Sequence, residues 1–171
     1  MMRKITTPAG EYVALVTARG VSRLFFPGTC PNPSGETEDK SAAAEKWARI
    51  LDRELKLFHQ GKLRRFSVPL DIPASLATPF RLRVWKEMRK IAFGHTLTYG
   101  ELARRSATLS ARATGGACGA NPIPILIPCH RVLAAGGRLG GFSAGLEWKR
   151  RLLLLEGSFP GEGTRHPPPG A

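Results

Sequence analysis

Alternating apolar and polar positions near the start of the chain predict a β-hairpin. Residues 11–18 and 21–26 are rich in Val, Leu and Phe, and Arg19-Gly20 between them can form the turn. The pattern then changes to a helical period after Ser41, a good N-cap residue, with an apolar stripe made of Trp47, Ile50, Leu51, Leu55 and Phe58. We expect this helix to pack on the hairpin.

A linker and a second, mainly helical region follow. A further strand is expected at 66–70, and residues 71–77, which include a proline and show little periodicity, form the best linker. A helical pattern then returns four times, at 79–93, 99–107, 111–120 and 147–156. Thr98 with Glu101 forms a capping box at the start of the second of these helices.

These elements predict an α/β fold of the α+β kind. A small N-terminal sheet-plus-helix domain would occupy residues 1–75, and a mainly helical C-terminal domain with a helix-turn-helix would occupy 76–157. Residues 158–171 contain four prolines and are expected to be a disordered tail.

The second helix of the expected helix-turn-helix, at 111–120, has almost no side chains. Its small residues include Ala111, Gly115, Gly116 and Gly119, which lower helix stability but let a partner approach the backbone closely. Close packing against another helix would explain the same glycines equally well. Only Arg112 has a side chain suited to reading base edges, so shape-dependent contact with DNA is favoured over sequence readout.

Charge supports a polyanionic partner without establishing one. The chain of 171 residues has 26 Lys and Arg against 13 Asp and Glu, a formal net charge of +13. Residues 1–75 contribute +4 and residues 76–171 contribute +9, so the excess lies in the half with the expected helix-turn-helix. A basic surface attracts nucleic acid, although a solvated basic face is the simpler explanation.

Location and metal content follow from what the chain lacks. No apolar run approaches the roughly 20 residues of a membrane span, and the first residues lack a signal-peptide apolar region. We therefore expect a cytoplasmic protein, associated with the nucleoid if the cell is prokaryotic, with no membrane contact. Three cysteines, Cys30, Cys118 and Cys129, indicate neither a disulfide framework nor a metal site.

The stretch from Asn121 to Val132 is the strongest candidate for chemistry. Its three prolines disfavour a continuous helix, and its apolar residues favour burial, so an extended and buried segment is expected to present Cys129 at its end. Most free cysteines are simply buried small residues. Here His130 and Arg131 follow directly, and cationic or imidazole groups beside a sulfur stabilise the reactive thiolate.

Pro-Cys-His-Arg-Val, preceded by Asn-Pro-Ile-Pro-Ile-Leu-Ile, resembles the active-site signature of the O6-alkylguanine-DNA alkyltransferases, also called methylated-DNA–protein-cysteine methyltransferases. The similarity runs from about Thr78 to Gly157, with a weaker N-terminal half. It implies repair of double-stranded DNA bearing O6-alkylguanine, and also of O4-alkylthymine, by a monomer that binds the minor groove and needs no cofactor or metal. The alkyl group would pass irreversibly to Cys129, once per molecule.

The resemblance also implies roles for individual residues. Cys129 would accept the alkyl group, supported by His130, Glu156 and the hydrogen-bonding Asn121. Tyr99 would crowd the 3′ phosphate and donate a proton to the leaving guanine, and Arg112 would take the place of the flipped nucleotide, although a phosphate contact would explain the same arginine. The expected substrate pocket comprises Val132, Phe142, Ser143 and Lys149.

Two features depart from the family pattern. Phe142 stands where many relatives have Tyr, which removes a polar contact to the base while keeping the ring. Cys118 lies in the expected recognition helix, where it is either a packing residue or a second reactive thiol.

Two other functions remain open at this stage. A cysteine hydrolase is disfavoured because its His normally comes from a distant segment, whereas Cys129 and His130 are adjacent. A non-catalytic protein that binds alkyl lesions and recruits other repair factors would share the basic charge and the helix-turn-helix. In such relatives the reactive cysteine is replaced, usually by Trp, so the intact Cys129 favours chemistry.

Overall fold

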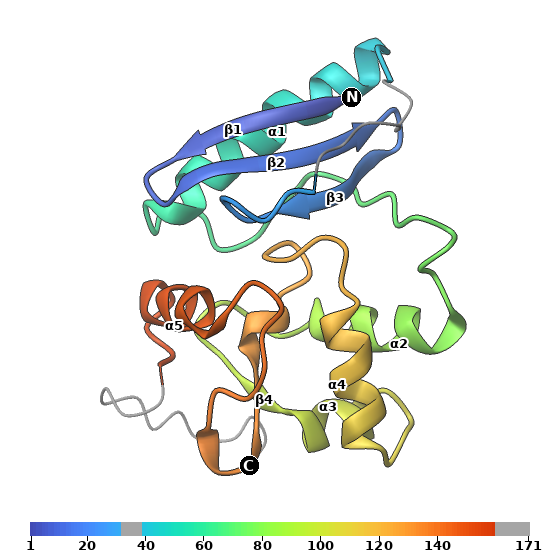
Figure 1. Cartoon of the computed structure of the whole chain (residues 1–171), viewed down its shortest axis with the longest axis vertical. Coiled ribbons are helices and arrows are strands. Elements are labelled where there is room, and N and C mark those ends of the chain that lie inside the picture. The colour runs from blue at the N-terminus through green and yellow to red at the C-terminus, as the bar shows by residue number, and fades with distance from the viewer. Residues whose placement is uncertain (32–38, 160–171) are drawn as a thin grey trace.

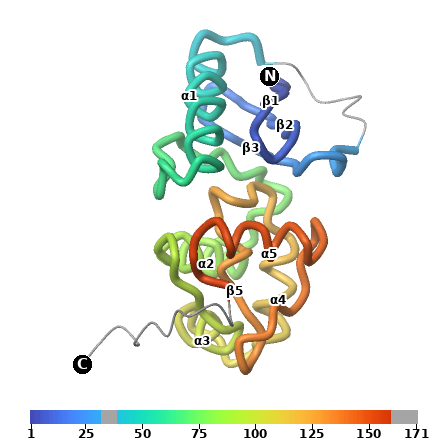
Figure 2. Tube along the Cα trace, turned by 90° about the vertical axis from the view of Figure 1, so that its left-hand side faces the viewer, coloured from blue at the N-terminus to red at the C-terminus, as the bar shows by residue number. Residues whose placement is uncertain are grey.

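The N-terminal part of the molecule is a three-stranded antiparallel sheet with one helix against it. The structure is a computed structural model and describes residues 1–31 and 39–159. Strands β1 (Met2–Thr7), β2 (Gly10–Thr17) and β3 (Gly20–Phe25) are ordered β1-β2-β3, and α1 (Ala42–His59) lies along one face of the sheet (Figures 1 and 2). The predicted hairpin and helix are thus confirmed, and the side chain of Ser41 accepts a hydrogen bond from the Ala44 amide at 3.1 Å.

Two predictions for this part were wrong. The first strand, β1, was not expected; its Ile5 pairs opposite Tyr12 of β2. The strand predicted at 66–70 is absent, because only Leu70 forms an isolated bridge to Val21. The Val21 amide donates to the Pro69 carbonyl at 2.9 Å, but proline has no N–H with which to continue a ladder.

The C-terminal part is mainly helical and lies beneath the sheet in Figure 1. Its long elements begin with a helix-turn-helix layer, and its two short strands pair in parallel through Leu97 with Val132. The elements are α2 (Pro79–Met88), β4 (Leu97–Thr98), α3 (Tyr99–Arg105), α4 (Ala111–Gly119), β5 (Val132–Leu133) and α5 (Leu146–Leu155). The Thr98 capping box is present, whereas α2 ends at Met88, well before the predicted end near Gly94.

One apolar core runs through both parts. It includes Tyr12 and Phe58 from the N-terminal domain and Trp85, Leu102 and Ile127 from the C-terminal domain. A backbone hydrogen bond from Leu24 in β3 to the Pro122 carbonyl, 2.9 Å long, joins the sheet to the segment that precedes Cys129. The sheet therefore supports the reactive segment directly.

The segment before Cys129 is not extended throughout, as had been predicted. The Ile127 amide donates to the Ile123 carbonyl at 2.9 Å, which makes a tight turn, and Ile125 within it has a φ of 73°. A buried β-branched residue rarely adopts this left-handed conformation. The turn leads into a single 3-10 turn, Cys129–Arg131, so the reactive residues lie on a bend and not at the end of a strand.

The ends of two other predictions fall on residues that are not described. Residues 160–171 of the expected tail lie outside the described residues, as do residues 32–38 of the loop expected after β3. Within the described ranges, none of the helices combines the length and the apolar character that crossing a membrane requires.

Candidate active site

Cys129 lies at a pocket between α4 and the loop before α5. The pocket has a volume of about 370 Å³. Its lining residues come from α3, α4, the 3-10 turn and residues 141–143: Tyr99, Gly115, Cys118, Gly119, Cys129, Gly141, Phe142 and Ser143. Since the side chain of Cys129 is only 5% exposed, a substrate must enter this pocket to meet the sulfur.

Asn121 holds the sulfur and the turn together. Its Nδ2 donates to Cys129 Sγ at 3.2 Å and to the Ile127 carbonyl at 2.7 Å, while its Oδ1 accepts from the Ile123 amide at 3.0 Å. An amide N–H stabilises a thiolate more than a neutral thiol. Asn121 therefore both shapes the segment and favours the reactive form of Cys129.

His130 and Glu156 form a buried pair on the other side of the turn. His130 Nε2 lies 2.8 Å from Glu156 Oε1, and neither side chain is exposed. An ionised carboxylate can only accept, so Nε2 carries the hydrogen and Nδ1 is left with its lone pair. Nδ1 is buried and has no hydrogen-bond partner among the described residues, which leaves it available as a proton acceptor.

Arg131 completes this pair, a role that the sequence analysis did not assign. Its Nε and Nη2 each donate to Glu156 at 2.9 Å, and its Nη1 donates to the Ile91 carbonyl at 2.6 Å. The signal that could have found it was an arginine inside the reactive motif itself, together with a lone acidic residue at the end of the last helix. Glu156 is thereby held by two cationic or imidazole partners from one 3-10 turn.

The electrostatic setting keeps the resting site neutral at the sulfur and the imidazole. Burial raises the pKa of Cys129, although the Asn121 hydrogen bond and the charge of Lys149 oppose this. Burial lowers the pKa of His130 despite the nearby Glu156, so the ring is a neutral base. Burial alone would raise the pKa of Glu156, but the hydrogen bonds and charges of His130 and Arg131 outweigh it and lower the pKa to about 2.

Lys149 acts on the pocket through the backbone. Its buried ammonium donates to the carbonyls of Val132 at 2.6 Å and Gly141 at 3.4 Å, and also to that of Leu139. Neither Lys149 nor Val132 lines the pocket; instead the lysine ties the strand after the 3-10 turn to the loop that carries Phe142 and Ser143. Burial lowers the pKa of Lys149 to about 8.

Tyr99 and Phe142 supply the rings of the pocket. The Tyr99 hydroxyl donates to the Gly141 carbonyl at 3.4 Å, and burial raises the pKa of Tyr99 to about 12, so the phenol keeps its proton. Phe142 packs edge-on against Phe26 of the N-terminal domain, with ring centroids 5.8 Å apart. The N-terminal domain thus helps to fix one pocket wall.

Helix α4 connects the pocket to the surface. Gly115 and Gly119 line the pocket, whereas Ala111, Arg112 and Gly116 are exposed on the helix. Cys118 also faces the pocket, but burial raises its pKa to about 12, which makes it an unreactive thiol. The structure therefore brings Cys129, Asn121, His130, Glu156, Tyr99, Phe142 and Ser143 together, and it places Arg112 outside the pocket on the first turn of α4.

A metal has no evident place in this arrangement. Over residues 1–31 and 39–159, no group of three or more His, Cys, Asp or Glu side chains is placed to hold an ion. The chemistry that the site offers is that of a buried thiol with a hydrogen-bonded amide, a neutral imidazole base and a carboxylate that orients the base.

Comparison with known proteins identifies relatives with a common activity. Residues 79–158 match the family described as 6-O-methylguanine DNA methyltransferase, DNA binding domain. A methylated-DNA–protein-cysteine methyltransferase of Methanosarcina acetivorans is 41% identical over 124 residues, which cover 72% of this chain and 78% of the relative. One from Mycolicibacterium paratuberculosis is 37% identical over 153 residues, covering 89% and 86%.

Solved structures agree over nearly the whole length. The structure of Mycobacterium tuberculosis OGT in complex with DNA superposes with a TM-score of 0.78 at 34% identity and covers 92% of each chain. The O6-methylguanine methyltransferase of the same organism superposes with the same TM-score and identity. The likeness includes the N-terminal sheet and helix, which the matched family segment does not reach.

Proposed function

This chain belongs to the methylated-DNA–protein-cysteine methyltransferase family, and on that premise we propose that Cys129 is the residue that accepts the alkyl group. The chain is a DNA-repair methyltransferase that acts on O6-methylguanine. The observation that carries the assignment of Cys129 is its place at a pocket, 3.2 Å from Asn121 and beside a buried histidine with a free ring nitrogen.

The proposed reaction uses each group around the sulfur. The Cys129 proton passes to His130 Nδ1 through a water molecule, and Glu156 stabilises the imidazolium that forms. The thiolate, held by Asn121, attacks the alkyl carbon on guanine O6. A sulfur–carbon bond forms, the carbon–oxygen bond breaks, and the guanine leaves with a proton from Tyr99, whose pKa of about 12 keeps it protonated until then. The thioether is stable, so each molecule acts once.

The same proposal includes extrusion of the damaged nucleotide. A base stacked in a duplex cannot reach a sulfur that is 5% exposed, so the nucleotide must rotate into the pocket. We propose that α4 lies against the minor groove, where Ala111 and Gly116 allow close approach. The exposed Arg112 would take the place of the extruded nucleotide, and Phe142, Ser143 and the Val132 backbone would contact the base.

Further parts of the proposal concern the whole chain. We propose a domain boundary near residues 75–76, a monomer in solution, and action in the cytoplasm, at the nucleoid in a prokaryotic cell. O4-alkylthymine would be a second substrate, because its alkyl group is also carried on an exocyclic oxygen. The shared core and the contact of Phe26 with Phe142 support a structural role for the N-terminal domain.

Intact mass spectrometry tests the assignment of the acceptor. The protein is incubated with a duplex that carries O6-methylguanine, then weighed and mapped by peptide. One added methyl group on Cys129 is expected, and Cys129→Ser should bind the duplex but gain no mass. Unchanged mass with tight lesion binding would instead support a non-catalytic lesion-binding protein, and a methyl group on Cys118 would refute the assignment.

Arg112→Ala tests extrusion separately from chemistry. The variant should lose far more activity on duplex than on a free O6-alkylguanine base, because only the duplex requires a vacated position in the stack. Single-turnover rates on the two substrates make the comparison. Equal losses on both would remove the role proposed for Arg112.

A further inference from the structure

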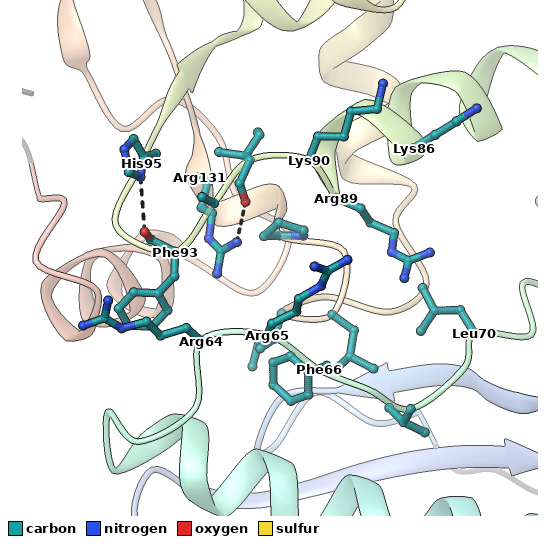
Figure 3. A pocket seen from close by; sticks show the side chains of 16 residues that line it. Arg64, Arg65, Phe66, Leu70, Lys86, Arg89, Lys90, Phe93, His95 and Arg131 are labelled. Carbon is teal, nitrogen blue, oxygen red and sulfur yellow. Dashed lines mark hydrogen bonds between the residues drawn. The ribbon is translucent and has the colours of Figure 1, made fainter. Parts of the chain in front are cut away.

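A second, larger cleft lies between the two domains. Its volume is about 890 Å³, and Figure 3 shows it bounded below by the chain around Arg65 and Phe66 and above by the end of α2. Residues 64–70 form one wall; residues 86–95 and the turn before and after Cys129 form the other. Pro128 and Arg131 line this cleft, while Cys129 between them lines the active-site pocket, so the two cavities flank one turn.

The cleft is strongly basic. Six of its lining residues are Lys or Arg and none is acidic: Arg64, Arg65, Lys86, Arg89, Lys90 and Arg131. Some of this charge is already compensated, because Lys90 pairs with Glu87 at 2.6 Å and Arg131 with Glu156 at 2.9 Å. The side chains of Arg65, Lys86 and Arg89 have no ion pair or hydrogen bond within residues 1–31 and 39–159.

The uncompensated guanidinium groups converge. In Figure 3 the head of Arg65 rises from the lower wall and that of Arg89 descends from the upper wall, both toward the gap that Arg131 borders. Like charges that face one another repel unless an anion lies between them. Guanidinium groups also match phosphate oxygens in geometry as well as in charge.

Apolar surface lies between the cations. Phe66, Leu70, Leu126 and Pro128 contribute to it, and Phe66 and Leu70 are only partly buried. A ligand that fits must therefore have several phosphates along one edge and flat, apolar groups beside them. A single-stranded nucleic acid has both, since its bases are not covered by a partner strand.

We propose that this interdomain cleft is a second nucleic-acid site, which binds a short single-stranded segment separately from the surface of α4. The phosphates lie against Arg65, Arg89 and Lys86, and a base rests on the apolar surface at Phe66. The volume is in the range of pockets that hold a small ligand, so the segment inside is only a few nucleotides long. The site does not depend on alkyl transfer.

Binding of a labelled tetrathymidylate, followed by fluorescence anisotropy on the full chain, tests the proposal. The variant Arg65→Ala with Arg89→Ala should weaken binding at least about tenfold, because two charge-assisted phosphate contacts are lost. Its logarithmic salt slope should become shallower by about 0.7 for each phosphate contact removed. The matched control, Lys46→Ala with Arg49→Ala, removes the same charge from the exposed side of α1 and should change affinity by less than about twofold.

Two further arms separate the cleft from the repair site. Arg112→Ala should bind tetrathymidylate normally, and a saturating undamaged duplex should leave most of the tetrathymidylate bound. Displacement by one equivalent of duplex, or equal loss in the cleft and α1 variants, would overturn the proposal. Inorganic phosphate that competes as well as the oligonucleotide, phosphate for phosphate, would overturn the single-stranded ligand. Retained methyl transfer to a free base by the cleft variant shows that it is folded.

Discussion

At the scale of single residues, the site is organised by what surrounds Cys129 and not by the sulfur alone. Burial disfavours the thiolate, and Asn121 offers one N–H against that cost. His130 is kept neutral and is oriented by Glu156, which Arg131 in turn holds. Reactivity is therefore a balance of a few hydrogen bonds, each of which a substitution can remove.

Asn121→Ala should slow alkyl transfer to a free base and move its pH dependence upward. The Asn121 hydrogen bond lowers the pKa of Cys129, so its loss raises that pKa and reduces the thiolate fraction at every pH below it. The rate near neutral pH should fall about tenfold or more, since a hydrogen bond to a charged group contributes about 1.5–3 kcal/mol. Single-turnover rates from pH 6 to 10 measure both effects. Cys118→Ala is the control and should leave the profile in place; a uniform loss without a shift would contradict the role given to Asn121.

Glu156→Gln should remove a pH-dependent part of the folding stability. The pKa of Glu156 is lowered to about 2, so its carboxylate stabilises the fold above its ordinary range and this contribution is lost as pH falls toward 2. The shift corresponds to about 3 kcal/mol. Urea unfolding at pH 6 and pH 3 should show a smaller decline for the variant than for the wild type, from a lower starting value because Arg131 loses its partner. The exposed Glu147→Gln should decline as the wild type does.

The sequence could predict the linear part of the site but not its tertiary part. Cys129, His130 and Asn121 lie within twelve residues of one another in an unusual motif, so a resemblance was enough to find them. The contact of Arg131 with Glu156 spans 25 residues and depends on where α5 ends. The backbone role of Lys149 depends on three carbonyls from two segments, which no local pattern encodes.

At the scale of elements, helix α4 combines a reactive pocket with an exposed surface on nine residues. Its glycines are not required by steric crowding within the fold. A Cβ at Gly115 would lie 3.8 Å from the Tyr99 ring, an ordinary contact, and one at Gly116 would meet nothing within 4 Å. The absence of side chains there thus serves the approach of a ligand.

Gly115→Ala and Gly116→Ala should therefore have the same effect on stability and different effects on activity. Each should stabilise the protein by up to about 1 kcal/mol, because alanine loses less conformational entropy in a helix. Only Gly115→Ala should slow the reaction with a free base, since Gly115 lines the pocket and Gly116 does not. Thermal unfolding and single-turnover rates make the test. Loss of stability in both variants would mean that the fold itself needs the glycines.

Helices were predicted better than strands, for a physical reason. Caps at Ser41, Thr78, Thr98 and Ser110 are local signals, and all four side chains accept the expected backbone hydrogen bond. Strand β1 has only Ile5 and Thr7 buried among its six residues, which is too little alternation to detect. Residues 66–70 are apolar enough for a strand, but burial against both domains, and not pairing, explains their composition.

At the scale of the whole molecule, charge and shape act together. The C-terminal half carries most of the excess positive charge, and the structure distributes it over α2, α4 and the interdomain cleft. Association with a duplex should depend on salt through the number of phosphates neutralised.

Duplex affinity should fall linearly with the logarithm of salt concentration, and Arg112→Ala should make the slope shallower by about 1. Cys129→Ser should leave the slope unchanged, because a buried uncharged thiol displaces no counterions. Anisotropy titrations with an undamaged duplex at several salt concentrations give the slopes. An unchanged slope in Arg112→Ala would show that this arginine does not approach the phosphates.

The left-handed Ile125 has a consequence for the time course of folding. A residue of this type in this conformation stores about 1–3 kcal/mol of backbone strain, which its burial in the core shared by both domains must offset. That burial is complete only after the sheet has docked on the helices, when Leu24 can also bond to Pro122. We therefore expect the turn at Cys129 to be among the last parts to assemble, so that a chain still emerging or half folded has a cysteine but not yet an activated one.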